Sequence, residues 1–173
     1  MKLETKNLFI RPPHINDFDD YWKMNNDPIA KKYTGGVIDL TYDEALEIHE
    51  KVCREFIDNP NKVFSVIEKS SEKCVGYCGL KYCDKLNGIE ICYGYSQSSW
   101  GQGYGYESAY EVFKYGFQVM GLKKVVAAVN PKNIASEKIL KKLGMIYVGK
   151  IDWSNQGKVN SYELTSEAYC QRR

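Results

Sequence analysis

The fold is decided around the glycine-rich segment Trp100-Gly101-Gln102-Gly103-Tyr104-Gly105. The residues just before it, 89–95, alternate in polarity and are rich in aromatic and β-branched side chains, which predicts a β-strand. After the segment, a helix over about residues 104–120 is expected to bury one face, because apolar or small residues recur at helical spacing: Ala109, Val112, Phe113, Gly116, Phe117 and Met120. A glycine-rich turn therefore connects a strand to a helix.

This turn has the composition of an anion-binding site. The first turn of a helix presents backbone N–H groups without partners inside the helix, and it carries the positive end of the helix dipole. Gly101, Gly103 and Gly105 lack the Cβ atoms that would keep a diphosphate away from the main chain. The segment thus indicates a phosphorylated cofactor, and the alternative is a tight turn that merely requires small residues.

Two common nucleotide motifs do not fit the segment. A Walker loop requires Gly-Lys-Ser/Thr after the turn, and no such sequence follows. A Rossmann fingerprint requires G-x-G-x-x-G and an acidic residue about twenty positions later. Here the glycines occupy alternate positions, and the next predicted strand, residues 125–129, carries no acidic residue.

Three blocks of sequence resemble one family. The central block extends from Glu90 through the glycine segment to Ala109, the second includes Asn130-Pro131-Lys132-Asn133-Ile134-Ala135-Ser136 and Leu143-Gly144-Met145, and the third is residues 3–12. Together they resemble the GCN5-related N-acetyltransferases (GNAT), in particular the branch of the ribosomal-protein-alanine acetyltransferases. The resemblance implies an α/β (mixed α+β) fold, in which about four helices flank a central mixed, mostly antiparallel seven-stranded sheet. It also implies acetyl-CoA as the cosubstrate.

Length and composition narrow the class of protein. The 173 residues suffice for one domain with a substantial core, so we expect a single N-acetyltransferase domain over residues 1–173. Lys and Arg number 24 against 22 Asp and Glu, a balance that gives no argument for nucleic acid. No apolar run is long enough to span a membrane, and the first residues do not form a secretory signal, so we expect a cytoplasmic protein. Six cysteines without a C-x-x-C pair do not indicate a metal site.

The predicted element order is β-α-α-β-β-β-α-β-α-β-β. The strands are expected at residues 8–11, 63–68, 74–82, 89–95, 123–129, 145–151 and 159–165, with a turn at 154–157 between the last two. The first helix follows Pro13 with Asn16 or Asp17 as its cap, the second is capped by Thr41 with Glu44, and the last covers residues 133–143. His49 lies on the apolar face of the second helix, which favours a packed rather than a catalytic histidine.

The resemblance also implies how the cofactor is held. In the family the central strand and the strand after the main helix splay apart, and CoA enters the gap. The pantetheine arm is then expected to pair with the backbone of Tyr93, Gly94 and Tyr95. The diphosphate is expected on the glycine segment, residues Trp100, Gly101, Gln102, Gly103, Tyr104 and Gly105. Asn133 is expected to contact the CoA arm, with capping of the last helix as the alternative.

Acetyl transfer needs a base for the amine and a proton for the departing thiolate. Glu90 corresponds to a strand glutamate of the branch and is the expected base, provided that burial raises its pKa above about 4.3. In much of the superfamily a tyrosine supplies the proton, but Leu140 occupies that position here. The branch's motif transfers this role to Ser136, for which a small polar residue in the first helical turn is the alternative interpretation.

The acceptor amine is expected to enter opposite the cofactor, between the loop at residues 33–38 and the hairpin at residues 153–158. Tyr33 and Trp153 are therefore the expected acceptor-binding residues. The acceptor is a small-molecule amine, such as a polyamine or an antibiotic, or a protein N-terminus, and the protein is a monomer or a homodimer. A non-catalytic CoA-binding module and an enzyme that uses a longer acyl donor are the alternative functions.

Overall fold

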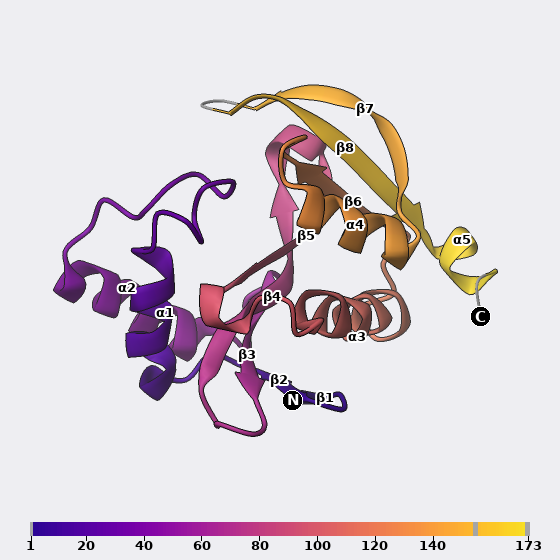
Figure 1. The fold of residues 1–173 in the computed structure, drawn as a ribbon. Coiled ribbons are helices and arrows are strands. Elements are labelled where there is room, and N and C mark those ends of the chain that lie inside the picture. Colours follow the sequence, from indigo (N-terminus) through magenta and orange to yellow (C-terminus); the bar gives the residue numbers. More distant parts are fainter. Residues whose placement is uncertain (1, 154–155, 172–173) are drawn as a thin grey trace.

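The computed structural model describes residues 2–153 and 156–171, which build one eight-stranded sheet (Figure 1). The strands lie in the order β1-β2-β3-β4-β5-β6-β8-β7, and all neighbours are antiparallel except β5 and β6. Their bounds are β1 Leu3–Glu4, β2 Leu8–Arg11, β3 Lys62–Glu68, β4 Cys74–Cys83, β5 Gly88–Tyr95, β6 Lys124–Val129, β7 Ile146–Trp153 and β8 Gly157–Thr165. The mixed, mostly antiparallel sheet confirms the expected fold class.

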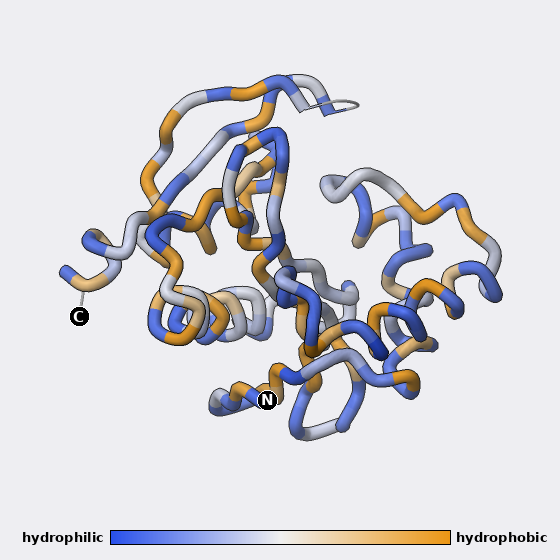
Figure 2. Tube along the Cα trace, turned by 180° about the vertical axis from the view of Figure 1, so that it is seen from behind, coloured by the Kyte–Doolittle hydropathy of each residue, from blue (hydrophilic) through white to orange (hydrophobic). Residues whose placement is uncertain are grey.

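The helices cover both faces of this sheet. They are α1 Phe18–Asn25, α2 Tyr42–Glu55, α3 Tyr104–Gln118, α4 Ile134–Leu143 and α5 Ser166–Cys170. On β4, Tyr77 contacts Tyr21 of α1 at a ring-centroid distance of 6.3 Å, whereas Leu80 lies against Gly116 of α3. Because successive strand residues point to opposite faces, α1 and α3 lie on opposite sides of β4, as Figures 1 and 2 show.

The core lies between the sheet and α3. The helix buries Ala109, Val112, Phe113 and Gly116, as the spacing of its apolar residues predicts, and Phe117 and Met120 pack at the margin. Their partners are fully buried strand residues: Leu8, Ile10, Phe64, Val66 and Leu80. In Figure 2 apolar and polar stretches alternate along the chain, as expected where each element has one side in the core.

The sequence pattern missed two short elements. Strand β1 pairs with β2 and raises the number of strands from the expected seven to eight. Helix α5 has five residues, and neither element is long enough to show a period. Helix α3 ends at Gln118 rather than Met120, and the turn expected at 154–157 lies partly outside the described residues.

The cap of the first helix differs from the prediction. Asp17 occupies the N-cap of α1 but makes no capping hydrogen bond with its side chain. Its carboxylate instead accepts two hydrogen bonds from Arg11, at 2.6 and 2.8 Å. A short 3₁₀ turn, Ile15–Asp17, precedes α1. Asp17 Oδ2 also accepts from the backbone N–H of His14 at 3.0 Å, so the carboxylate closes the capping box of this turn rather than capping α1.

Two other local predictions are confirmed. Thr41 and Glu44 form a capping box at the start of α2, with Thr41 Oγ1 accepting from the Glu44 backbone N–H at 3.3 Å. His49 is buried, packs against Phe18 and places Nε2 3.0 Å from a backbone oxygen. It is a packed side chain outside the cavity described below.

Candidate active site

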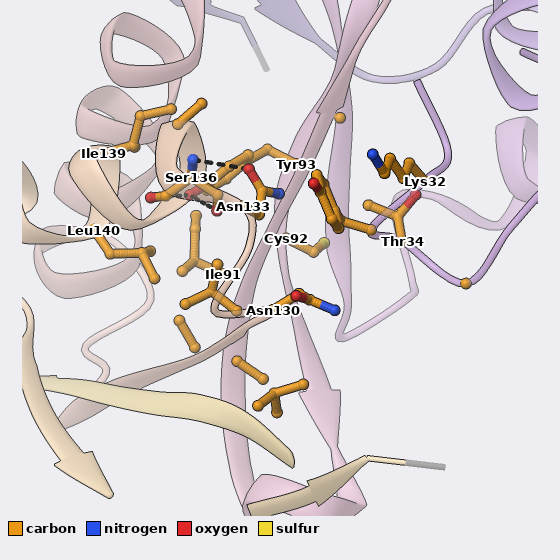
Figure 3. A pocket seen from close by; sticks show the side chains of 18 of the residues that line it. Lys32, Thr34, Ile91, Cys92, Tyr93, Asn130, Asn133, Ser136, Ile139 and Leu140 are labelled. Atoms are coloured by element: carbon orange, nitrogen blue, oxygen red, sulfur yellow. Dashed lines mark hydrogen bonds between the residues drawn. The ribbon is translucent and has the colours of Figure 1, made fainter. Parts of the chain in front are cut away.

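Strands β5 and β6 lie together only at one end. Their parallel pairing has a single register position, Glu90 with Val126, whereas β4 accompanies β5 along its whole length to Tyr95. A cavity of about 670 Å³ lies where the two strands separate, lined by β5, β6, α4, residues 29–30 and 32–35, and Trp153 (Figure 3). The gap that the family resemblance implies is therefore present.

The register of β4 with β5 assigns the lining side chains to two faces. Lys81 is opposite Glu90, and both, with Cys92, lie on the side of α1. Tyr93 and Tyr95 point to the other side, where Tyr95 Oη is hydrogen-bonded to Ser108 of α3. The cavity thus has one end on the α1 side of β5, at Lys81 and Glu90, and another end on the opposite side, at Tyr93 and at Ser136 of α4.

Glu90 is buried at the first of these ends. Its side chain is 9% exposed, and burial raises its pKa, while the charge of Lys81 and the backbone N–H of Ala128 act in the opposite direction. Burial therefore acts in the direction that a base at this position requires. Burial also raises the pKa of the neighbouring Cys92 thiol to about 12. That thiol stays protonated at neutral pH and is a poor nucleophile.

Ser136 and Tyr93 form a pair of hydroxyl groups at the other end. Their oxygens are 2.9 Å apart, and either can donate (Figure 3). Asn133 Oδ1 caps α4 by accepting from the Ser136 backbone N–H at 3.1 Å, and its amide nitrogen faces the cavity. Leu140 lines the cavity one turn further along the helix and is 1% exposed.

The side chain of Tyr93 was missed by sequence reasoning. The strand pattern suggested a role for the backbone of Tyr93, Gly94 and Tyr95, and nothing local indicated a partner 43 positions away. Strand alternation was the available signal, since it puts Tyr93 on the face opposite Glu90. Gly94 has its own structural requirement, because a Cβ there would lie 2.8 Å from the ring of Tyr77.

The glycine segment forms the N-terminus of α3. Gly101 and Gly103 have φ of 78° and 81°, in the left-handed region, and a Cβ at either would meet nothing within 4 Å. The space over this turn is therefore open. Gly105 serves packing instead, since a Cβ there would lie 2.7 Å from Ile139 of α4. Gln102, between the first two glycines, is exposed.

Two aromatic residues flank this turn in different ways. Trp100 lines the cavity and donates from Nε1 to the carbonyl oxygen of Tyr95 at 3.0 Å, which ties the turn to the end of β5. Tyr104 directs its hydroxyl to Glu68, at 2.6 Å, away from the cavity. Only the backbone of Tyr104 can therefore face a diphosphate at the helix end.

The opening of the cavity where the acceptor is expected to enter has two walls. Tyr33 and Trp153 both line the cavity, from the loop between α1 and α2 and from the end of β7. The loop contributes residues 29–30 and 32–35 rather than the expected 33–38, and Ile38 lines a smaller apolar pocket beside α2 instead. Lysines also line the cavity, and sequence reasoning did not identify them: Lys32, Lys81 and Lys132.

Residues 2–153 and 156–171 contain neither a metal-ligand cluster nor a membrane-spanning helix. No group of three His, Cys, Asp or Glu side chains there could hold a metal ion. No helix in that part of the chain is long and apolar enough to cross a membrane. The six cysteines are free thiols.

Comparison with known families decides the assignment. Residues 7–146 match the acetyltransferase (GNAT) domain. The chain belongs to the GNAT family. It is accordingly an N-acetyltransferase, which favours the enzyme over the non-catalytic CoA-binding module.

Individual relatives agree with this assignment. The chain is 27% identical over 162 residues to the uncharacterised N-acetyltransferase p20 of Bacillus licheniformis, covering 93% of this chain and 86% of that protein. A ribosomal-protein-S5-alanine acetyltransferase of Vibrio fischeri has the same fold, with a TM-score of 0.77, 15% identity and 98% of each chain covered. Spermidine N-acetyltransferase of Vibrio cholerae, solved with CoA and spermine, gives a TM-score of 0.80 at 17% identity, covering 96% of this chain and 99% of that chain.

Proposed function

We propose that this GNAT enzyme transfers the acetyl group of acetyl-CoA directly to a primary amine within a ternary complex. One observation carries the proposal. The cavity between β5 and β6 is lined both by a buried carboxylate, Glu90, and by a paired hydroxyl, Ser136. These are the two proton-handling groups that the reaction requires.

The cofactor fits the gap in one direction. Its diphosphate binds the open N-terminal turn of α3, where backbone N–H groups face solvent and no side chain stands in the way. The pantetheine arm runs along the edge of β5 at Tyr93, Gly94 and Tyr95, which β6 leaves without a strand partner. The amide nitrogen of Asn133 is placed to bind the same arm.

The chemistry then follows from the residues at the two ends. Glu90 takes a proton from the ammonium group, directly or through water, and the neutral nitrogen attacks the thioester carbonyl. As the tetrahedral intermediate collapses, the C–S bond breaks and the CoA sulfur takes a proton from Ser136, whose hydroxyl is held by Tyr93. The attacking nitrogen releases its second proton to solvent, and the serine oxygen regains a proton from solvent, so the net proton released is the one that Glu90 removed. The high pKa of Cys92 argues against a route through an acetyl-cysteine.

The acceptor binds between Tyr33 and Trp153, and it is a small amine or a protein N-terminus. A screen of amines and N-terminal peptides tests the function, with release of CoA thiol and the acetylated product followed together. Acetyl-CoA should be consumed in step with product. If no acceptor increases thiol release above the rate in buffer, the proposed activity is wrong.

A further inference from the structure

The charged groups at the acceptor end of the cavity are mostly cationic. Among the described lining residues, Glu90 is the one carboxylate, whereas Lys32, Lys81 and Lys132 are cations. Lys132 is adjacent to Asn133, at the end assigned to the cofactor, so it is set aside. Lys32 and Lys81 remain beside the entrance.

Lys81 is the cation nearest to the base. It is the cross-strand neighbour of Glu90 on the same face, where opposed Cβ atoms are about 5 Å apart. Its charge lowers the pKa of both Glu90 and Cys92, which places its field at the reacting end. None of the described ion pairs includes Lys81 or Lys32.

Further lysines strengthen this positive field. The pKa of Lys31 is lowered by burial and by the charge of Lys81, which shows that two ammonium groups lie near each other here. Lys85 does not line the cavity, but its Nζ lies 5.2 Å from the ring centroid of the lining residue Trp153. Asp27, just before this loop, keeps its negative charge, because the hydrogen bond from Gln97 at 2.6 Å lowers its pKa, but it does not line the cavity.

A polyamine fits this end poorly. When one amine of a polyamine reaches Glu90, its other ammonium groups meet Lys81 and Lys32, and like charges at such distances repel. An acceptor with a carboxylate a few bonds from its amine has the opposite charge pattern, because the amine faces Glu90 while the carboxylate faces Lys81.

We infer that the acceptor is a small primary amine with an adjacent carboxylate, that is, an amino acid. The inference rests on the proposed function and specifies the substrate class of the same site. A single lysine beside the base matches one negative charge close to the amine, and the register that places Lys81 opposite Glu90 lets both side chains reach one small molecule.

The experiment compares free L-amino acids with their C-terminal amides, with spermidine, and with peptides that begin with alanine and so have no carboxylate near the amine. Free amino acids should have a kcat/KM at least tenfold above that of their amides and of spermidine. Lys81→Gln should raise the KM for amino acids about tenfold and change the KM for amides less than twofold. Lys81→Glu should raise the kcat/KM for spermidine. The rates are compared at the pH plateau of each variant, because Lys81 also shifts the pKa of Glu90.

Matched controls separate the possible results. Lys73→Gln, in the turn between β3 and β4, should change nothing, and an unchanged acetyl-CoA affinity shows that each variant is folded. Equal or better use of amides, spermidine or peptides would overturn the inference while leaving the acetyltransferase function intact. If no compound of the panel is acetylated and none increases thiol release above the rate in buffer, the proposed function itself is refuted.

Discussion

At the residue scale, the reaction depends on how burial sets the protonation of Glu90. An ordinary glutamate has a pKa of about 4.3 and competes poorly for an amine proton. Burial raises the pKa of Glu90, and Lys81 limits the increase. The two residues are opposite each other on β4 and β5, so a base and the group that tunes it come from one hairpin.

Glu90→Gln should lower kcat about 10²-fold while preserving the shape of the site. The wild-type kcat/KM should fall as the pH drops through the raised pKa of Glu90, and this limb should be absent in the variant. Lys81→Gln removes a charge that lowers the pKa, so its limb should move to higher pH. Rate profiles between pH 5 and 9 test both shifts, and an unchanged limb in Glu90→Gln would assign the base elsewhere.

Glu90→Gln should lower activity but should not lower the stability of the fold. A carboxyl group whose pKa is higher in the folded state favours its protonated form there, so its contribution to stability is lost as pH rises through that pKa. Glu90→Gln should therefore unfold at the same or a higher temperature than wild type at pH 8. Thermal unfolding at pH 5 and 8 measures this. A variant that loses both activity and stability at pH 8 would indicate a structural role.

Ser136 and Tyr93 make the second residue-scale prediction. Ser136→Ala should lower kcat about 10²-fold with little change in acetyl-CoA affinity, because the thiolate loses its proton donor. Tyr93→Phe keeps the ring packed and should lower kcat about tenfold, because the serine hydroxyl loses its hydrogen-bond partner. The double variant should be no slower than Ser136→Ala, since the two act as one unit. A loss below threefold in Ser136→Ala would make the serine structural.

At the element scale, the N-terminus of α3 is built by two glycines in the left-handed region. Their open surroundings mean that glycine is required there for backbone conformation and for access, and not for packing. Gly121, just beyond the same helix, has φ of 67° and equally open surroundings. It offers the same strain without a proposed ligand.

Gly103→Val should therefore weaken acetyl-CoA binding at least tenfold, because the side chain enters the path of the diphosphate. Gly121→Val should cost similar stability, through the same unfavourable φ, and leave binding unchanged. Isothermal calorimetry with acetyl-CoA, together with thermal unfolding, distinguishes the two effects. Equal acetyl-CoA affinities in the two variants would show that the diphosphate does not bind at this turn.

The sequence predicted the long elements because hydrophobic periodicity is a local property. Helix α3 and strand β5 were predicted in this way, and the separation of β5 from β6 through family resemblance. The short β1 and α5 have too few residues for a period. Lys81 was missed for another reason. Its spacing is that of any solvated lysine, and its position beside Glu90 follows only from the register of two strands.

At the scale of the whole molecule, the sheet consists of two parts that meet at β5 and β6. One part contains β1 to β5, the other β6 to β8, and a single register pair between Glu90 and Val126 connects the two across the gap. A cofactor arm that pairs with β5 adds backbone hydrogen bonds where the strands have separated. Binding should therefore stabilise the junction locally as well as the fold by mass action.

Acetyl-CoA at a hundredfold excess over its Kd should add about 2.7 kcal/mol to the free energy of unfolding, a rise in Tm of roughly 5 to 10 °C. Hydrogen exchange measured by mass spectrometry should show new protection at residues 92–95 and 102–107. Strands β1 and β2, at the far edge, should exchange as before, because they lie outside the gap. If Tm rises while residues 92–95 gain no protection, the pantetheine arm does not pair with β5, and the proposed path of the cofactor along this strand is wrong.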